Sequence, residues 1–144
     1  MPKESTTPDL VELMRRFLDA ANSPDLDTMM SFYAPDAVFN MTGAALGPFE
    51  GGAAIRGFHE DWWGAYEEYE IQTEEVLDLG NGVVLVVLRQ NARPVGSTGH
   101  VQTQTAGTSE WEHGKIARVT VYHDIDEARA AAEQLAEERA QADV

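Results

Sequence analysis

The hydrophobic positions of this chain change their spacing near its middle. Up to about residue 68 they recur every three or four residues, which is typical of helices that bury one face. This spacing predicts helices over residues 8–22, 24–33 and 53–68. Thr7 precedes a proline and an acidic residue, so we expect it to be the N-cap of the first helix. Between the second and third helices we expect a turn, a short strand over 37–40 and a glycine-rich loop.

From Tyr69 apolar and polar residues alternate, which predicts a strand. The first strand runs to the turn Gly80–Gly82, and a three-stranded meander follows over Val83–Asp124. Its turns are marked by Pro94–Gly99 and by His113–Gly114. We expect a final helix over 125–142, for which Asp124 is the expected N-cap.

The turn at His113–Gly114 has two interpretations. A two-residue loop would pair Glu112 with Lys115, whereas a three-residue loop with a bulge would pair Trp111 with Lys115. We expect the second form, because only Gly114 then needs a positive φ. The choice matters because a shift of one residue exchanges the two faces of a strand.

Under the expected register, one face of the last two strands is the more core-like and is placed inside. It carries Thr103, Thr105, Gly107, Ser109, Trp111, Ala117, Val119, Val121 and His123. The opposite face is more polar and is placed outside. It carries Gln102, Gln104, Thr108, Glu110, Ile116, Arg118, Thr120 and Tyr122, of which Ile116 and Tyr122 are candidates for a dimer surface.

Helices gathered on one side of an antiparallel sheet predict an α+β fold. The length of 144 residues is that of one domain, so we expect a single domain over 1–144 with its core over about 8–124 and an acidic C-terminal helix over 125–142. A strongly bent sheet would wrap around the helices and leave a conical cavity.

Charge and composition exclude several classes of function. Ten basic residues stand against 25 acidic ones, giving a net charge of −15, which disfavours binding to nucleic acids or anionic membranes. Cysteine is absent, so disulfides, thiolate nucleophiles and cysteine-ligated metals are excluded. No apolar run approaches the ~18 residues of a membrane span, and the first residues lack the apolar segment of a secretory signal. We therefore expect a cytoplasmic protein.

Three segments, PDLDTMMSFYAPDAVF, FEGGAAIRGFHEDW and EWEHGKIARVTVYHD, resemble the NTF2-like superfamily and most closely its SnoaL-like branch. With the order of elements, the resemblance covers about residues 8–124. It implies a cone in which a bent antiparallel or mixed sheet wraps around three N-terminal helices, with a pocket for a small apolar or aromatic molecule. A homodimer through the outer sheet face is common in this superfamily. The members include isomerases, cyclases, dehydratases and proteins without known activity, so the resemblance implies a fold more than a reaction.

Two histidines are the candidates for acid–base catalysis, because imidazole titrates near neutral pH. His123 ends the last strand on the expected inner face, and His59 lies on the apolar face of the third helix. Each could instead be a structural histidine whose ring nitrogens form hydrogen bonds with neighbouring groups. Together they could form an acid–base pair across a cavity, as in the related scytalone dehydratases. His100 and His113 are expected at the surface, no two histidines have metal-ligand spacing, and we expect neither a metal nor a cofactor.

Other residues are candidates for contacting a ligand. Asn40 could offer an amide from the end of the first strand, and Arg89 could supply a charge if its face of the strand is inside. If that face is outside, Arg89 pairs with surface acids. The remaining candidates are apolar or aromatic and would line the cone: Phe17, Tyr33, Met41, Trp62, Trp63, Trp111, Val119 and Val121.

The resemblance also argues against one reaction. Ketosteroid isomerases of the superfamily use a carboxylate base, a tyrosine and an acid at positions that correspond here to Met41, Phe17 and Gly107. None of these three can transfer a proton. The leading hypothesis is therefore a SnoaL-like isomerase, cyclase or dehydratase in which His59 and His123 handle protons. The alternative is a non-catalytic module that binds a small molecule or dimerises.

Overall fold

Six strands form one mixed sheet in the order β2-β1-β6-β5-β4-β3, in which β1 and β6 are parallel and all other neighbours are antiparallel. The computed structural model describes residues 9–23, 25–41 and 46–142. The helices and strands, in chain order, are α1 (Leu10–Asn22), α2 (Leu26–Met30), β1 (Tyr33–Met41), β2 (Leu46–Glu50), α3 (Gly52–Gly64), β3 (Tyr66–Gly80), β4 (Val83–Pro94), β5 (Val101–Glu112), β6 (Lys115–Tyr122) and α4 (Ile125–Ala142).

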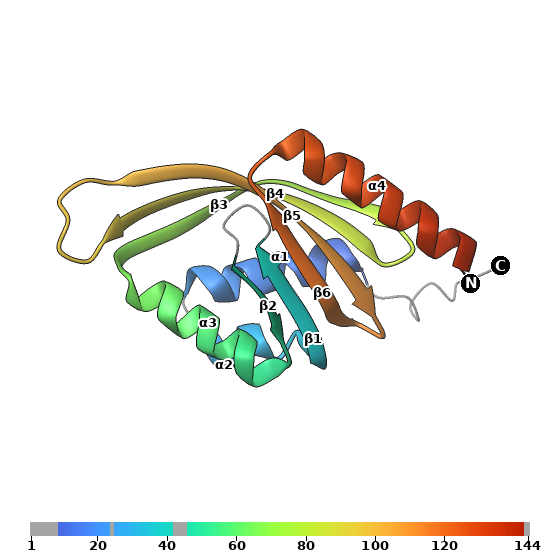
Figure 1. Cartoon of the computed structure of the whole chain (residues 1–144), viewed down its shortest axis with the longest axis horizontal. Helices are drawn as coiled ribbons and strands as arrows, with labels where there is room; N and C mark the ends of the chain where they lie inside the picture. The colour runs from blue at the N-terminus through green and yellow to red at the C-terminus, as the bar shows by residue number, and fades with distance from the viewer. Residues whose placement is uncertain (1–8, 24, 42–45, 143–144) are drawn as a thin grey trace.

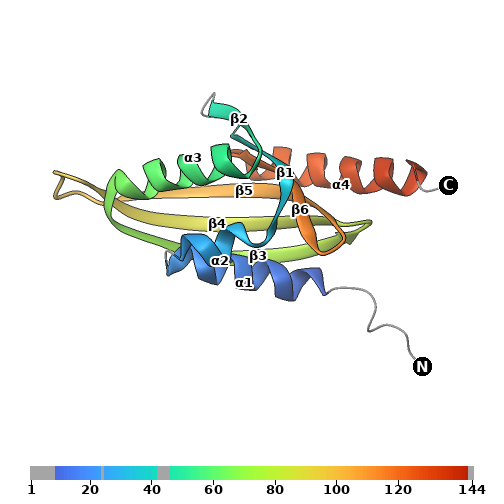
Figure 2. The same ribbon diagram turned by 90° about the horizontal axis from the view of Figure 1, so that it is seen from below.

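The first three helices lie on one side of the curved sheet and α4 lies on the other (Figure 1). Seen from below, α1 runs along β3 while α3 lies toward β1 and β2, so the middle strands are left between the two helices (Figure 2). Among the described helices, none has the length and apolar character needed to cross a membrane. The arrangement is the α+β fold that the sequence predicts.

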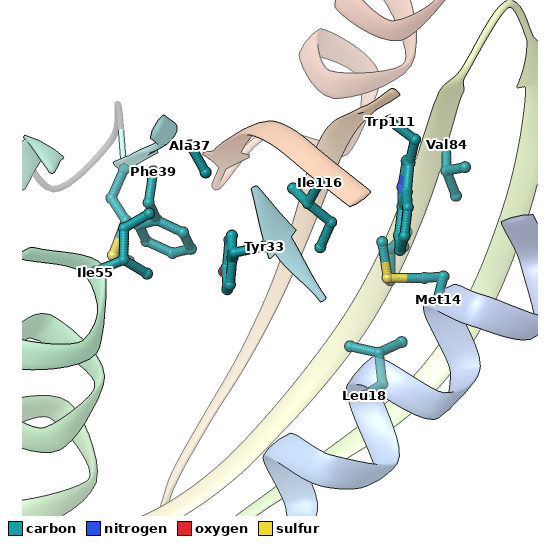
Figure 3. Close-up of a cluster of buried hydrophobic side chains, with 11 residues drawn as sticks. Met14, Leu18, Tyr33, Ala37, Phe39, Ile55, Val84, Trp111 and Ile116 are labelled. Carbon is teal, nitrogen blue, oxygen red and sulfur yellow. The ribbon is translucent and has the colours of Figure 1, made fainter. Parts of the chain in front are cut away.

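The apolar stripe of α1 faces the concave side of the sheet and buries Met14 and Leu18. Figure 3 shows the Trp111 ring beside Met14 and Val84, while Phe39 lies beside Ile55 of α3. Asp9 is the N-cap of α1, and its carboxylate accepts a hydrogen bond from the Glu12 amide at 3.2 Å. The expected N-cap, Thr7, lies outside the described residues.

The segment between α2 and α3 differs from the sequence-based prediction. Strand β1 begins already at Tyr33, and residues 34–36, predicted as a turn, lie within it. The pairing of β1 with β6 is irregular between Tyr33 and Val38, which leaves room for Pro35 in the strand. Strand β2 was missed, because a pairing with β1 inside a glycine-rich segment has no local pattern.

The hairpin between β5 and β6 shows that the expected three-residue turn is wrong. Glu112 pairs with Lys115, and both His113 (φ 55°) and Gly114 (φ 79°) adopt positive φ. Such a two-residue turn has the twist that flanking strands require, which outweighs the strain at His113. The register then shifts by one residue in β6, because Trp111 pairs with Ile116 but Glu110 pairs with Arg118.

From Arg118 to the end of β6, the shift restores the predicted inner face. Between the turn and the shift, the predicted faces of β6 are exchanged. Gly107 and Ser109 pair with Val121 and Val119, as members of one inner face. Ile116, expected outside, is instead fully buried in the inner core. It is therefore not part of a dimer surface.

The outer face of β4 is covered by α4. The alanines Ala128, Ala132 and Ala136 pack against Val83, Leu85 and Val87, and Tyr122 packs against the same cluster. Small side chains allow the helix to approach the sheet closely. The Arg139 guanidinium donates to the carbonyl oxygen of Trp111 at 3.0 Å, which ties the helix to β5. Asp124 is the predicted N-cap and accepts a hydrogen bond from the Glu127 amide at 3.0 Å.

Candidate ligand pocket

A cavity of about 130 Å³ lies between α1, α3 and the concave face of the sheet. Its walls come from α1, α2, α3 and every strand except β2. The wall residues are mostly aliphatic and aromatic, and none of the described residues that line it is Asp, Glu, Lys or Arg. The cavity is therefore an apolar pocket with a few polar groups.

Eight of the predicted site residues line this cavity: Phe17, Tyr33, Met41, His59, Trp62, Trp63, Val119 and Val121. They converge from α1, α3, β1 and β6, segments that are far apart in the sequence. Gly107, the position of the missing acid, lines the cavity as well, as does Thr108, which was expected outside. Met41, Phe17 and Gly107 thus all lie in the cavity wall, and none of the three carries a carboxylate.

Four predicted site residues, all in the described part of the chain, lie elsewhere. Asn40 stands between two cavity residues of β1 and so points to the other side of the strand. Arg89 lies on the outer face and pairs with Glu74 at 3.1 Å, which was the alternative interpretation. Trp111 is buried in the core beside the cavity, where its indole N–H donates to Ser109 Oγ at 2.9 Å. His123 follows the end of β6 and is exposed.

The exposure of His123 has a simple cause. Alternation places it on the face of Val119 and Val121, but β6 ends at Tyr122, before the strand reaches that position. The ring is therefore not held against the cavity. The expected pairing of His123 with His59 across the pocket is not found among the described residues.

The partner that the structure brings to His59 is Tyr33. The Tyr33 Oη and His59 Nε2 atoms lie 3.5 Å apart, linking β1 to α3 at the cavity wall. This separation is longer than a typical hydrogen bond, so both groups keep the capacity to bind another oxygen. Both residues are candidates from the sequence, although Tyr33 was expected only as part of the lining.

Burial controls the charge of this pair. It lowers the pKa of His59 to about 4, because the imidazolium ion loses its hydration among the rings of Phe39, Phe58 and Trp63. Burial also raises the pKa of Tyr33. Both side chains are therefore neutral at pH 7. The pair offers one hydroxyl and one neutral imidazole to the cavity.

A second pair of polar side chains lines the cavity, one from β4 and one from β5. The Gln90 amide nitrogen and Thr105 Oγ1 are 3.5 Å apart, and both residues line the cavity. Thr105 was expected on the inner face of its strand, whereas Gln90 was not a candidate, because the sequence left open which face of β4 is inside. The alternation of Val86, Leu88 and Gln90 settles that face.

A metal ion in a protein binds several His, Asp or Glu side chains at once. Within the residues that the structure describes, no group of three or more His, Asp or Glu side chains could hold a metal ion. The chemistry available at the cavity wall is thus that of a phenol, an imidazole, an amide and hydroxyl groups.

Residues 14–119 match the SnoaL-like domain family. The chain belongs to this family. The SnoaL-like resemblance and the NTF2-like cone predicted from the sequence are thus confirmed. A comparison with curated protein sequences finds no match.

Solved structures with the same fold share little sequence with this SnoaL-like chain. An NTF2-like protein of unknown function from Burkholderia pseudomallei is 14% identical over 88% of this chain and 98% of its own, with a TM-score of 0.73. A candidate SnoaL-like polyketide cyclase from Shewanella denitrificans is 14% identical over 88% and 98%, with a TM-score of 0.68. An LEH-like epoxide hydrolase of M. tuberculosis is 18% identical over 86% and 89%, with a TM-score of 0.67. These likenesses show the fold alone.

Proposed function

We propose that the cavity binds a small, neutral and largely apolar molecule whose oxygen atom is held by Tyr33 and His59. The observation that supports this most directly is the 3.5 Å approach of Tyr33 Oη and His59 Nε2 at the wall of a mostly apolar pocket. Ligand pockets commonly combine an apolar lining with a few polar groups that fix the orientation of the ligand.

Size and charge narrow the ligand class. A cavity of about 130 Å³ is close to the ~150 Å³ of an engineered cavity that holds benzene, which favours a single ring. A charged ligand is disfavoured, because burying an ion without a partner is costly. The described lining has no side chain of opposite charge to compensate for either sign.

Phenol and toluene form a matched pair of probes, since they share a ring and differ in a hydroxyl or a methyl group. We expect both to raise the melting temperature of the protein and phenol to bind more tightly, because its hydroxyl can contact the Tyr33–His59 pair. Calorimetric titration measures the two affinities, with benzoate as the charged control. Equal affinities for phenol and toluene would show that the polar pair does not bind ligand oxygen.

A second candidate function is acid–base catalysis by the same two residues. Tyr33 can donate a proton toward a carbonyl oxygen while neutral His59 accepts one from the adjacent carbon, which converts a ketone to its enol. Isomerisation and cyclisation can both begin with this step. The likeness to a candidate polyketide cyclase agrees with such chemistry without identifying it. In this candidate mechanism Tyr33 is the partner of His59 in proton transfer, the role that was expected of His123.

Deuterium exchange at the α-carbon of cyclohexanone tests this candidate. The protein in D₂O is expected to accelerate exchange above the buffer rate, and His59→Gln is expected to remove the acceleration. The exposed His123→Gln variant is the matched control and should retain it. If the protein binds phenol but does not accelerate exchange, the binding function is supported and acid–base catalysis by Tyr33 and His59 is excluded.

A homodimer and a cytoplasmic location remain proposals. Because α4 covers one end of the outer sheet face, we propose that any dimer forms through the uncovered end, where Arg89 and Gln104 both contact Glu74. Light scattering after size exclusion measures the mass directly. A monomeric mass at high protein concentration would rule out the dimer.

A further inference from the structure

A second hollow adjoins the apolar pocket, with a volume of about 200 Å³. It is lined by Ala21, Trp63, Tyr66, Glu67 and Tyr69, and it shares Ala21, Trp63 and Tyr69 with the inner pocket. We will call these five residues the outer chamber. We propose that the outer chamber binds an organic cation, specifically a quaternary ammonium group.

Aromatic rings make up most of the outer chamber. Tyr66 and Tyr69 lie with their ring centroids 5.6 Å apart, and Trp63 forms another wall. Their faces carry partial negative charge, so a cation within about 6 Å of a ring is attracted electrostatically. A quaternary ammonium ion suits such walls, because its methyl groups contact the rings and it needs no hydrogen-bond acceptor.

Glu67 adds a formal negative charge to the chamber. Its side chain is 47% exposed, and its Oε1 accepts from Arg93 Nη1 at 2.9 Å and from the Gly96 amide at 3.3 Å. Arg93 also pairs with Glu68 at 3.3 Å. Two carboxylates thus share one guanidinium, and this group of three side chains keeps a net negative charge.

The outer chamber differs from the inner pocket in the ligand that it favours. The described lining of the inner pocket has no charged side chain, whereas Glu67 stands in the outer one. One carboxylate is too few for a Ca²⁺ or Mg²⁺ ion, which takes six or more oxygen ligands. The net charge of −15 further raises the local concentration of organic cations.

Choline and 3,3-dimethylbutan-1-ol test the proposal, because they have the same shape and differ in the charge of the central atom. Calorimetric titration of the full chain should give an affinity for choline at least about tenfold higher than for the neutral alcohol. Tyr66→Leu should reduce choline binding severalfold, while Tyr66→Phe, which keeps the ring, should retain it. Circular dichroism confirms that each variant is folded.

Glu67→Gln and Glu68→Gln form a second matched pair. Each removes one negative charge that pairs with Arg93, but only Glu67 lines the chamber. We expect Glu67→Gln to weaken choline binding more than Glu68→Gln does. Equal affinities for choline and the neutral alcohol, or equal binding by the two tyrosine variants, would overturn the proposal.

The outer chamber does not require the inner pocket to be occupied. Phenol binding tests the inner pocket through Tyr33 and His59, neither of which lines the outer chamber. A protein that binds phenol but not choline would refute this inference alone. A protein that binds choline but not phenol would refute only the function proposed for the inner pocket.

Discussion

The Tyr33 hydroxyl oxygen lies 3.5 Å from the Nε2 atom of His59, where β1 faces α3. Tyr33 is almost fully buried, with 6% of its surface exposed, and His59 is surrounded by aromatic rings. A neutral polar pair is thereby held at the wall of an apolar pocket.

The depressed pKa of His59 predicts a pH dependence of stability. Its pKa is about 4 in the folded protein and about 6.5 when unfolded, so the unfolded state binds more protons between these values. The contribution of neutral His59 is fully present above pH 6.5 and is lost as the pH falls toward 4. Between pH 7 and 5 we expect a loss of about 1 to 2 kcal/mol in unfolding free energy.

Urea denaturation at the two pH values measures that loss. His59→Gln should reduce the difference between pH 7 and 5, because the titrating group is gone. The exposed His113→Gln variant is the control and should keep the wild-type difference. An unchanged difference in His59→Gln would contradict the assigned burial effect.

Asn22 is predicted to hold α1 on the sheet. Its side-chain amide donates to the Ile71 carbonyl oxygen and accepts from the Ile71 amide, each at 2.7 Å. Asn22→Ala removes both hydrogen bonds and leaves two backbone groups of β3 without partners. We expect a loss of about 2 to 3 kcal/mol in urea denaturation. Asn22→Asp, which can still accept but cannot donate, should fall between alanine and wild type.

Two glycines distinguish backbone strain from steric clash. Gly80 (φ 88°) and Gly82 (φ 82°) both adopt positive φ, but only at Gly82 would a Cβ atom meet a neighbour, the Trp111 carbonyl oxygen at 2.5 Å. Gly80→Ala is expected to cost about 1 to 2 kcal/mol from the backbone alone, because an L-residue is strained at this φ. Gly82→Ala should cost clearly more, as measured by thermal unfolding. Equal costs would contradict the close approach of β5 to this turn.

Packing of α4 on the sheet is tested by two alanines of the same helix. Ala132 is fully buried against the outer face, whereas Ala130 is exposed. Ala132→Leu forces extra volume into this interface and is expected to cost about 1 to 3 kcal/mol. Ala130→Leu should change the melting temperature little. A tolerated Ala132→Leu would mean that α4 does not pack closely on β4 in solution.

The fold could be predicted from the sequence because its periodic segments are long. The alternation in β3, the continuous apolar run that opens β4 and the helical stripe of α1 leave few other interpretations. Strand β2 and the early start of β1 escaped prediction, since both depend on pairing between segments that lack a local pattern. At Glu112–Lys115 the local preference for a single positive φ was outweighed by the twist of the strands.

The candidate site was only partly predictable. The positions of Tyr33, His59 and the aromatic residues in the cavity wall could be predicted, because the hydrophobic pattern of the sequence shows which helix and strand faces are apolar. His123 was misplaced because alternation says which face a residue shares but not where the strand ends. Gln90 was missed because a continuous apolar strand does not reveal which of its faces is inside.

The most direct test of the polar pair compares phenol and toluene in the wild type and in Tyr33→Phe and His59→Phe. The variants keep aromatic rings at both positions while removing the two groups that can bind oxygen. The wild type is expected to favour phenol over toluene by about tenfold, from one or two hydrogen bonds, and each variant should lose most of that preference while still binding toluene. A phenol preference that persists undiminished in both variants would contradict the assignment of Tyr33 and His59 as the ligand-binding pair.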